Sequence, residues 1–127
     1  MKIYDCFMFF DEELLLDLRL NILDKYVDKF IITEATYMHS GKPKKLNFNI
    51  NKFSKFKEKI IYNIIDKLPP NLASINKEDD KETRGKKLIN NSNKREHYQR
   101  ELALKSLEKA DPNDIILIND IDEIPNL

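Results

Sequence analysis

The sequence predicts a single α/β domain in which a parallel β-sheet is flanked by helices. Three observations lead to this fold class. The chain has 127 residues, which is within the usual size of one domain. Its 41% hydrophobic and 35% charged residues are typical of a globular protein. Strand-like apolar segments alternate with helix-like segments in the order β-α-β-α-β-α-β, and this alternation favours a parallel sheet.

The first third of the chain predicts a strand, a helix and a second strand. Residues 2–10 are rich in aromatic and β-branched side chains, as strands are. The acidic residues 11–13 then open a leucine-rich helix that extends through Tyr26, and acidic residues in a first turn suit the positive end of the helix dipole. Residues 30–33 form a short strand of the buried type that ends at Glu34.

The middle of the chain predicts a turn, a short helix, a third strand and a long excursion. The turn is marked by Gly41-Lys42-Pro43. Phe53 and Phe56, three residues apart in a lysine-rich stretch, indicate a short helix before a strand at residues 59–65. Residues 66–90 contain two adjacent prolines and few large apolar side chains, so we expect a mobile excursion there.

The last third predicts a helix and a fourth strand. The helical pattern extends over residues 93–110, where Asn93 with Glu96 suits a capping box, and Pro112 ends it. Residues 114–118 are an almost uninterrupted apolar run, which is typical of a strand whose sheet is covered on both faces.

Charge and cysteine content exclude several classes of function. The 22 basic and 22 acidic residues cancel, and with few arginines this argues against nucleic acid as a partner. Two glycines in total leave no glycine-rich phosphate loop. Cys6 is the only cysteine, so neither an internal disulfide nor a cysteine metal site is expected. No apolar run is long enough to span a membrane, and we expect a cytoplasmic protein.

The charges are unevenly distributed along the chain. Residues 1–40 carry four basic and eight acidic side chains, and residues 108–127 carry one basic and six acidic. Residues 41–59 carry seven lysines and one glutamate. The carboxylates therefore concentrate near both ends, with a basic segment between them.

Several carboxylates follow directly on predicted strands. In an open parallel sheet, ligands bind beyond the carboxyl ends of the strands, and there the sequence places Glu12, Glu34, Asp66 and residues 119–123. In the last group Asp120 and Asp122 are two residues apart and face the same way. Such a pair suits Mg²⁺ or Mn²⁺, which bridges nucleotide phosphates. The alternative is a solvated turn, but without a basic neighbour in the sequence the pair favours a cation.

Five segments together resemble glycosyltransferase family 17, the β-1,4-mannosyl-glycoprotein β-1,4-N-acetylglucosaminyltransferases. Asn119-Asp120-Ile121-Asp122-Glu123-Ile124-Pro125 resembles the family's Asp-x-Asp-Glu-Ile-Pro segment. Leu15-Leu16-Asp17-Leu18-Arg19-Leu20-Asn21 is similar to its first helix. Residues 30–35 are similar to its second strand, and residues 41–43 to the turn that follows. Tyr98-Gln99-Arg100 resembles a Tyr-x-Arg before the metal motif. The matches occur in the right order over nearly the whole chain.

The resemblance implies the N-terminal half of a GT-A fold, with a Rossmann-like sheet and residues 1–127 as one nucleotide-sugar-binding domain or half-domain. It implies a UDP-sugar donor, Mn²⁺ or Mg²⁺, and inverting transfer of N-acetylglucosamine to a glycan acceptor. It also implies that a complete enzyme continues beyond Leu127 with an acceptor-binding half. We therefore expect this chain to be a fragment, a processed piece or a natural short homologue, and we assign no catalytic base.

Carried over residue by residue, the resemblance implies five site residues. Asp120 and Asp122 would hold the metal, with Asp120 also facing the donor. Phe10 would border the nucleobase, and Glu34 would lie near the uracil or ribose unless it braces a loop instead. Arg100 would approach the donor diphosphate or brace the acidic edge, unless it is an exposed helical arginine paired with Glu96 or Glu101.

Other prominent residues are interpreted as structural. Arg19, in the leucine-rich helix, is expected to form an ion pair rather than to contact a ligand, and Cys6 to be a small core residue. In that helix Leu14 with Leu18, and Leu15 with Ile22, recur at helical spacing. His39 and His97 lack metal-ligand spacing, and Lys42 is expected to be solvated.

Two other classes of function compete with a transferase. One is a non-catalytic binding or assembly module, with or without nucleotide-sugar binding, whose lysine-rich residues 41–59 meet an acidic partner. The other is a nucleotidyltransferase, which also uses paired carboxylates on metal but finds no support in the turn at residues 41–43.

Overall fold

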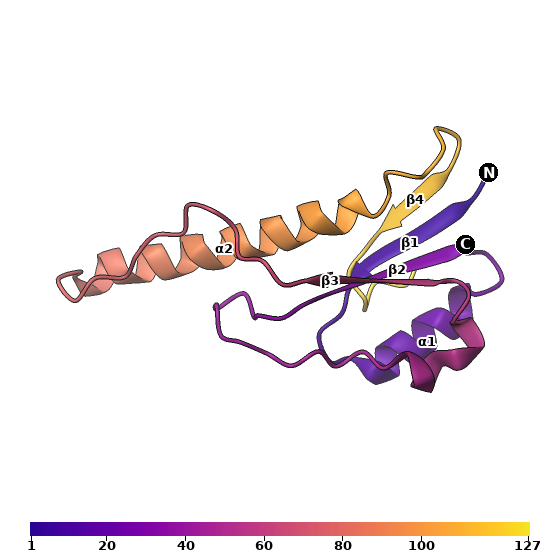
Figure 1. The fold of residues 1–127 in the computed structure, drawn as a ribbon, viewed down its shortest axis with the longest axis horizontal. Coiled ribbons are helices and arrows are strands. Elements are labelled where there is room, and N and C mark those ends of the chain that lie inside the picture. Colours follow the sequence, from indigo (N-terminus) through magenta and orange to yellow (C-terminus); the bar gives the residue numbers. More distant parts are fainter.

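The computed structural model describes residues 1–127, the whole chain, as one sheet between two helical layers (Figure 1). The elements are β1 (Ile3–Met8), α1 (Glu13–Leu23), β2 (Lys29–Ala35), the 3-10 helix η1 (Ile50–Phe56), β3 (Ile60–Ile65), α2 (Lys81–Lys105) and β4 (Ile115–Ile118). The predicted alternation of strands and helices is confirmed, with η1 as the short helix expected around Phe53 and Phe56.

All four strands are parallel and lie in the order β3-β2-β1-β4. In the two pairings that β1 makes, Cys6 lies opposite Ile31 of β2 and Ile118 of β4. The connections cross over through helices, as parallel strands require. The predicted fold class, a Rossmann-like parallel sheet with flanking helices, is therefore confirmed.

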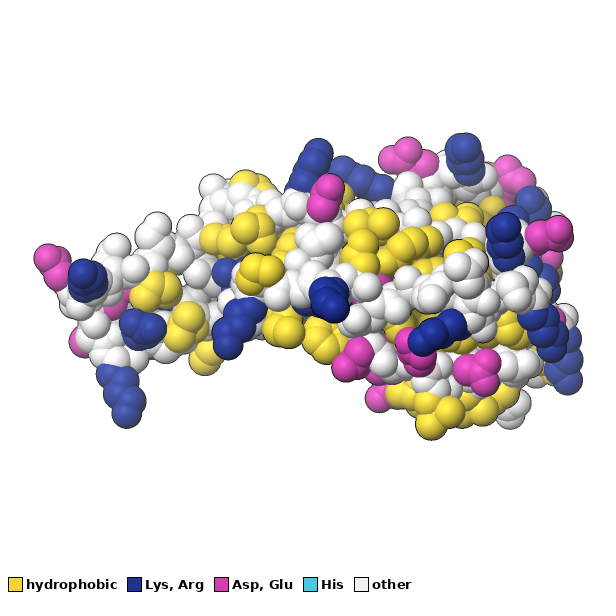
Figure 2. Space-filling view, turned by 60° about the horizontal axis from the view of Figure 1, so that its bottom comes forward, with side chains coloured by type: hydrophobic (Ala, Val, Ile, Leu, Met, Phe, Trp, Pro, Cys, Tyr) yellow, Lys and Arg dark blue, Asp and Glu magenta, His cyan; other side chains and the backbone are white.

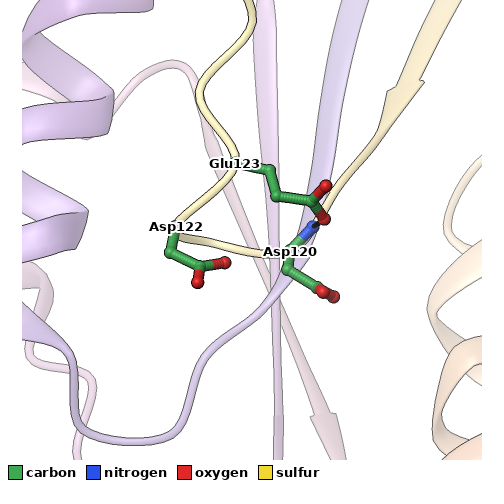
Figure 3. Close-up of side chains that lie close together, drawn as sticks. All are labelled: Asp120, Asp122 and Glu123. Carbon is green, nitrogen blue, oxygen red and sulfur yellow. Dashed lines mark hydrogen bonds between the residues drawn. The ribbon is translucent and has the colours of Figure 1, made fainter.

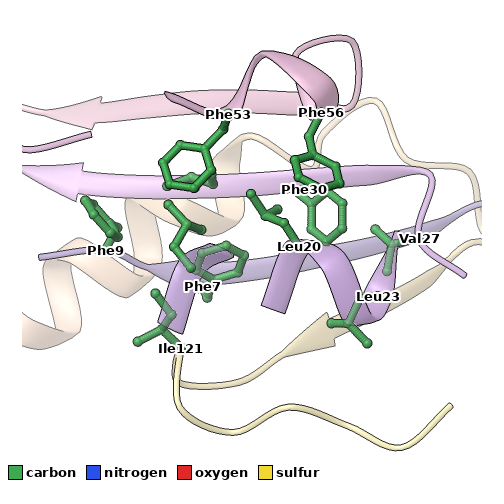
Figure 4. Close-up of a cluster of buried hydrophobic side chains, with 11 residues drawn as sticks. Phe7, Phe9, Leu20, Leu23, Val27, Phe30, Phe53, Phe56 and Ile121 are labelled. Atoms are coloured by element: carbon green, nitrogen blue, oxygen red, sulfur yellow. The ribbon is translucent and has the colours of Figure 1, made fainter. Parts of the chain in front are cut away.

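The sheet buries a different set of side chains on each face. One face packs against α1 and η1 around a cluster of eleven buried residues (Figure 4). The opposite face carries a smaller cluster of Tyr4, Cys6 and Ile31, against which Leu107 and Ala110 pack after the end of α2. Because side chains alternate along a strand, neighbouring residues of β1 and β2 contribute to different layers.

The buried side of α1 is not the one that leucine spacing suggested. Leu14, Leu18 and Ile22 are exposed. The buried positions follow the spacing i, i+3, i+4, i+7 and are Leu16, Arg19, Leu20 and Leu23. The charged Arg19 occupies the second of these positions. The buried face is therefore not continuously apolar, and leucine spacing alone does not identify it.

Helix α2 begins at Lys81, twelve residues before the predicted start at Asn93. Its N-cap is Asp80, whose side chain accepts a hydrogen bond from the backbone N–H of Thr83 at 2.7 Å. The first half of α2 extends beyond the sheet as a narrow arm that carries lysine and arginine side chains (Figures 1 and 2). Part of the stretch predicted as an excursion, residues 66–90, is therefore helical. Its apolar content is low because the first half of α2 covers no sheet and is surrounded by solvent. The mobility expected there stays a prediction.

Strand β4 is an edge strand, and the expectation that both its faces are covered is wrong. Ile115, Ile116 and Ile118 are each at least 40% exposed. Helix α2 packs against β1, β2 and β3, so little covers the faces of β4, which pairs only with β1. None of the helices combines the length and the apolar character needed to cross a membrane.

Candidate functional site

A pocket of about 650 Å³ lies at the carboxyl ends of the strands, as expected for an open parallel sheet. It is formed by residues that follow β1, β2 and β4, by the start of α1 and by one side of α2. The lining residues are Met8, Phe9, Phe10, Glu12, Leu15, Ala35, Tyr37, Met38, His39, Ser40, Lys44, Glu96, Gln99, Arg100, Asp120, Ile121 and Asp122. The structure therefore brings four of the five candidate site residues, Phe10, Arg100, Asp120 and Asp122, to one pocket.

The turn after β4 carries three acidic side chains, Asp120, Asp122 and Glu123 (Figure 3), and the first two line the pocket. Asp120, Asp122 and Glu123 are exposed, and one carboxylate oxygen from each lies within 4.8 Å of the others. The backbone N–H of Asp120 donates to Oε1 of Glu123 at 3.0 Å, and the N–H of Glu123 donates to the Asp120 carbonyl at 2.9 Å. Ile121 points the other way and is 8% exposed within the main core cluster, as the alternation of Asp120 and Asp122 predicted.

The acidic turn fits a divalent cation by its chemistry. Three carboxylates offer hard oxygen donors, the ligands that Mg²⁺ and Mn²⁺ prefer. Their exposure leaves space for waters and a phosphate to complete the coordination shell. The turn has no basic neighbour in the sequence, but Arg100 approaches it in space: its Nη2 lies 3.7 Å from Oδ1 of Asp120 and 3.0 Å from Oε1 of Glu96. Arg100 thus lies beside the acidic edge of the pocket and also pairs with Glu96 one turn away on the same helix.

Phe10 forms part of the wall nearest β1. Its ring is 40% exposed, and Nζ of Lys44 lies 5.3 Å from the ring centroid. Its carbonyl accepts a hydrogen bond from Nδ2 of Asn47 at 2.7 Å. A half-exposed aromatic ring at this edge offers an apolar surface on which a planar base can stack.

Glu34 lies behind the pocket wall rather than on it. Its side chain is fully buried. One carboxylate oxygen accepts from Nζ of Lys44 and the backbone N–H of Asn47, both at 2.6 Å. The other accepts from the N–H of Phe48 at 3.0 Å and from the Tyr62 hydroxyl at 2.7 Å. With these four donors, Glu34 ties the loop at residues 44–48 to the sheet, which favours the loop-bracing role over contact with a nucleoside.

Two opposing effects act on the pKa of Glu34. Desolvation by burial is the largest single cause and raises the pKa. The hydrogen bonds from Lys44, Asn47, Tyr62 and Phe48 together outweigh it, so the pKa is lowered. The same contact raises the pKa of Tyr62, through burial first and then through the bond to the Glu34 carboxylate. Glu34 is therefore held as a carboxylate that braces the loop.

The wall beyond β2 is a tight loop held against α2. Gly41 has φ +91°, and its N–H donates to the Met38 carbonyl at 2.8 Å. Nη1 of Arg95 donates to the His39 carbonyl at 2.8 Å, and Nε2 of His39 lies 3.2 Å from Oε1 of Gln99. The predicted turn is present but begins earlier than residues 41–43: it spans residues 38–41, and Pro43 pairs with Tyr37.

Glu12, which the sequence places after the first strand, lines the pocket. Sequence reasoning gave no pocket position to three other polar residues that line it: His39, Lys44 and Gln99. His39 and Gln99 meet there because α2 packs beside the loop after β2, and Lys44 is held there by the buried Glu34. No local sequence pattern reports these contacts.

The ion pair expected for Arg19 is confirmed, and its partner is Asp5. Its guanidinium and the Asp5 carboxylate are both 0% exposed and form a bidentate pair. Burial, and then the charge of Asp5, raise the pKa of the neighbouring Cys6 thiol to about 12, which agrees with a buried core cysteine.

The family model of glycosyltransferase family 17 matches residues 1–127, the entire chain. No curated protein and no solved structure matches the chain.

Proposed function

Because the chain belongs to glycosyltransferase family 17, and is therefore a sugar-transferring enzyme by family, we propose that its pocket binds the donor of that reaction. The donor is a UDP-sugar, UDP-N-acetylglucosamine by the family resemblance, and the acceptor is a glycan hydroxyl. The observation that carries this proposal is the acidic turn, in which the carboxylates of Asp120, Asp122 and Glu123 lie close together and the first two line a 650 Å³ pocket at the strand ends.

We assign Asp120 and Asp122 to a divalent cation, Mn²⁺ or Mg²⁺, with Glu123 beside them. A cation bound there supplies the positive charge that stabilises a leaving diphosphate. Arg100, 3.7 Å from Asp120, adds a second positive group on the same side of the pocket. Its planar fork suits phosphate oxygens.

Phe10 and the loop braced by Glu34 provide the other end of the donor site. The half-exposed Phe10 lines the same pocket as Asp120 and Asp122, and a uracil stacked on its ring would place the diphosphate in the pocket with that turn. Glu34 contributes by holding residues 44–48 in place.

In the proposed inverting transfer the acceptor oxygen forms a bond to the anomeric carbon as the bond from that carbon to the diphosphate oxygen breaks. The hydroxyl proton passes to a general base, and UDP leaves. The residues named above bind and orient the donor, so that the face of the sugar opposite the diphosphate is open to attack.

The lysine-rich segment gives little support to the alternative of a binding module for an acidic partner. Three of its seven lysines are engaged within the fold: Lys44 with Glu34, Lys52 with Glu13, and Lys59 with Asp24. The remaining positive charge is that of an ordinary solvated loop, so the donor-binding pocket is the better supported function.

Thermal unfolding with UDP and Mn²⁺ tests the proposal. A ligand present at 100 times its Kd adds about 2.7 kcal/mol to stability, so the midpoint should rise with both together and fall back on addition of a chelator. Asp122→Asn should abolish the rise. Glu101→Gln, which makes the same charge change at an exposed position of α2 outside the pocket, is the matched control and should keep it. An unchanged wild-type curve at millimolar UDP and Mn²⁺ would contradict the proposal.

A further inference from the structure

The Arg19 guanidinium joins three parts of the molecule at one buried point. From the middle of α1, its Nε donates to Oδ2 of Asp5 and its Nη2 donates to Oδ1, both at 2.7 Å. The ring of Phe7 lies 4.8 Å from Cζ. Since both charged groups are 0% exposed and bound at two points, the guanidinium is fixed relative to β1.

The remaining nitrogen of Arg19 faces the acidic turn. Nη1 donates to the backbone carbonyls of Asp120 at 3.1 Å, Ile121 at 3.2 Å and Glu123 at 2.7 Å. These three carbonyls belong to the turn from which the candidate metal ligands project. The partners are 101 to 104 residues from Arg19 in the sequence.

These contacts exceed what a structural ion pair needs. The pair with Asp5 uses only Nε and Nη2, and Asp5 neutralises the charge, so Nη1 acts on the turn through geometry. Few other backbone contacts hold the turn: the N–H of Asn119 reaches the Cys6 carbonyl at 3.4 Å, and the N–H of Glu123 bonds within the turn itself. Arg19 is thus the main polar tether between the turn and the rest of the fold.

We propose that Arg19 is a positioning residue for the acidic turn: it fixes the backbone that presents Asp120, Asp122 and Glu123, and thereby sets their affinity for a divalent cation. The inference rests on the metal site of the proposed function. It requires arginine specifically, because a lysine ammonium keeps the charge beside Asp5 but lacks the planar fork that spans a carboxylate and a turn at once.

Hydrogen exchange and Mn²⁺ binding on the full chain test this role. Arg19→Lys should speed amide hydrogen exchange of Asn119, Asp120 and Glu123 by about tenfold or more in metal-free protein. The turn opens more easily in this variant because the Nη1 hydrogen bonds, which must break before wild type opens, are absent. Mn²⁺ affinity, measured by electron paramagnetic resonance without nucleotide, should fall by about 10–100-fold, as when an outer-shell partner of a metal ligand is lost.

Two further variants keep the test decisive. Leu23→Ala is the matched control: Leu23 is a 0% exposed core residue at the far end of α1, so its loss should destabilise the fold without selective loosening of the turn. The double variant Asp5→Leu/Arg19→Met removes the turn contacts without leaving an unpaired charge, and replacement of a buried pair by apolar residues is often tolerated. It serves if Arg19→Lys does not fold, and it should also loosen the turn.

The outcomes separate the inference from the function on which it rests. Selective loosening with weakened Mn²⁺ binding in the Arg19 variants, but not in Leu23→Ala, supports it. The inference is overturned if the exchange rates of the turn amides and the Mn²⁺ affinity change no more in the Arg19 variants than in Leu23→Ala. A wild-type chain that does not bind Mn²⁺ refutes the proposed metal site, and the exchange comparison then still supports or overturns the role of Arg19 in holding the turn.

Discussion

Replacement of Glu34, which does not itself line the pocket, by glutamine should destabilise the fold. In Glu34→Gln the amide oxygen can still accept from Lys44 and Asn47, and the Tyr62 hydroxyl can rotate to accept from the new NH₂ group. The N–H of Phe48, however, then faces a donor, and Lys44, whose side chain is 5% exposed, loses its counterion.

The magnitude follows from these losses. Removal of one partner from a buried ion pair costs about 3–5 kcal/mol. Nζ of Lys44 keeps two carbonyl acceptors, those of Ala35 and Lys45, so we expect the lower end, about 3 kcal/mol. With a urea m-value of about 2 kcal/mol/M for a small protein, the unfolding midpoint should move down by about 1.5 M. Tyr62→Phe removes a single donor and is the control, with an expected loss of about 1 kcal/mol.

The pH dependence gives a second measurement on the same variant. The folded pKa of Glu34 is lowered below its ordinary value, so its contribution is fully present above the unfolded pKa of about 4.3. It is lost as the pH falls through the folded pKa, where the carboxylate takes up a proton. The difference in unfolding free energy between wild type and Glu34→Gln should therefore shrink between pH 7 and acid pH. A variant that unfolds at the wild-type urea concentration but no longer binds UDP would refute the bracing role and favour contact with the nucleoside.

Two further predictions concern Gly41 and Cys6. Gly41→Ala should lower stability by about 1–2 kcal/mol, since φ is +91° and the added Cβ would lie 2.6 Å from Nη2 of Arg95; thermal unfolding measures it. Gly85→Ala, where a Cβ meets nothing within 4 Å inside α2, should instead stabilise by up to about 1 kcal/mol, and equal losses in both would contradict the reasoning. Cys6, with its pKa raised to about 12 by burial and then by Asp5, should resist iodoacetamide at pH 8 until urea unfolds the chain; rapid alkylation of the native protein, measured by mass spectrometry, would show that the thiol is accessible.

The fold class could be predicted because its signals are local. Each strand is a short apolar run, and the connections are long enough for crossovers, so alternation alone favours a parallel sheet. The start of α2 and the exposure of β4 were predicted less well, because both depend on which other elements pack against them. The arm formed by the first half of α2 has no sheet to cover and shows no apolar stripe. Strand β4 has an apolar run but only one neighbouring strand.

The candidate site was predictable where residues follow a strand directly. Asp120 and Asp122 lie just beyond β4 and Phe10 just beyond β1, and parallel strands bring these ends to one edge. Glu34 also lies at a strand end, but at the last residues of β2 its side chain turns to the layer that α1 and η1 cover. Position along a strand therefore predicts the edge that a residue reaches, whereas the face depends on where the strand begins.

Arg19 and Glu34 show how far buried charges can be interpreted from sequence. Arg19 occupies an otherwise leucine stripe of α1, and Asp5 lies in an apolar strand; two opposite charges in elements that pack together predict a pair, because neither can be buried alone. The sequence pattern does not reveal that Arg19 also contacts the turn at residues 120–123. Nη1 donates to backbone carbonyls there, and every residue has a backbone carbonyl. Glu34 likewise accepts from two backbone N–H groups as well as from Lys44 and Tyr62. In both cases the charged side-chain partner can be recognised in the sequence by its residue type, whereas the loop held through backbone groups cannot. A buried charge therefore indicates from sequence that a loop is held, but not which loop.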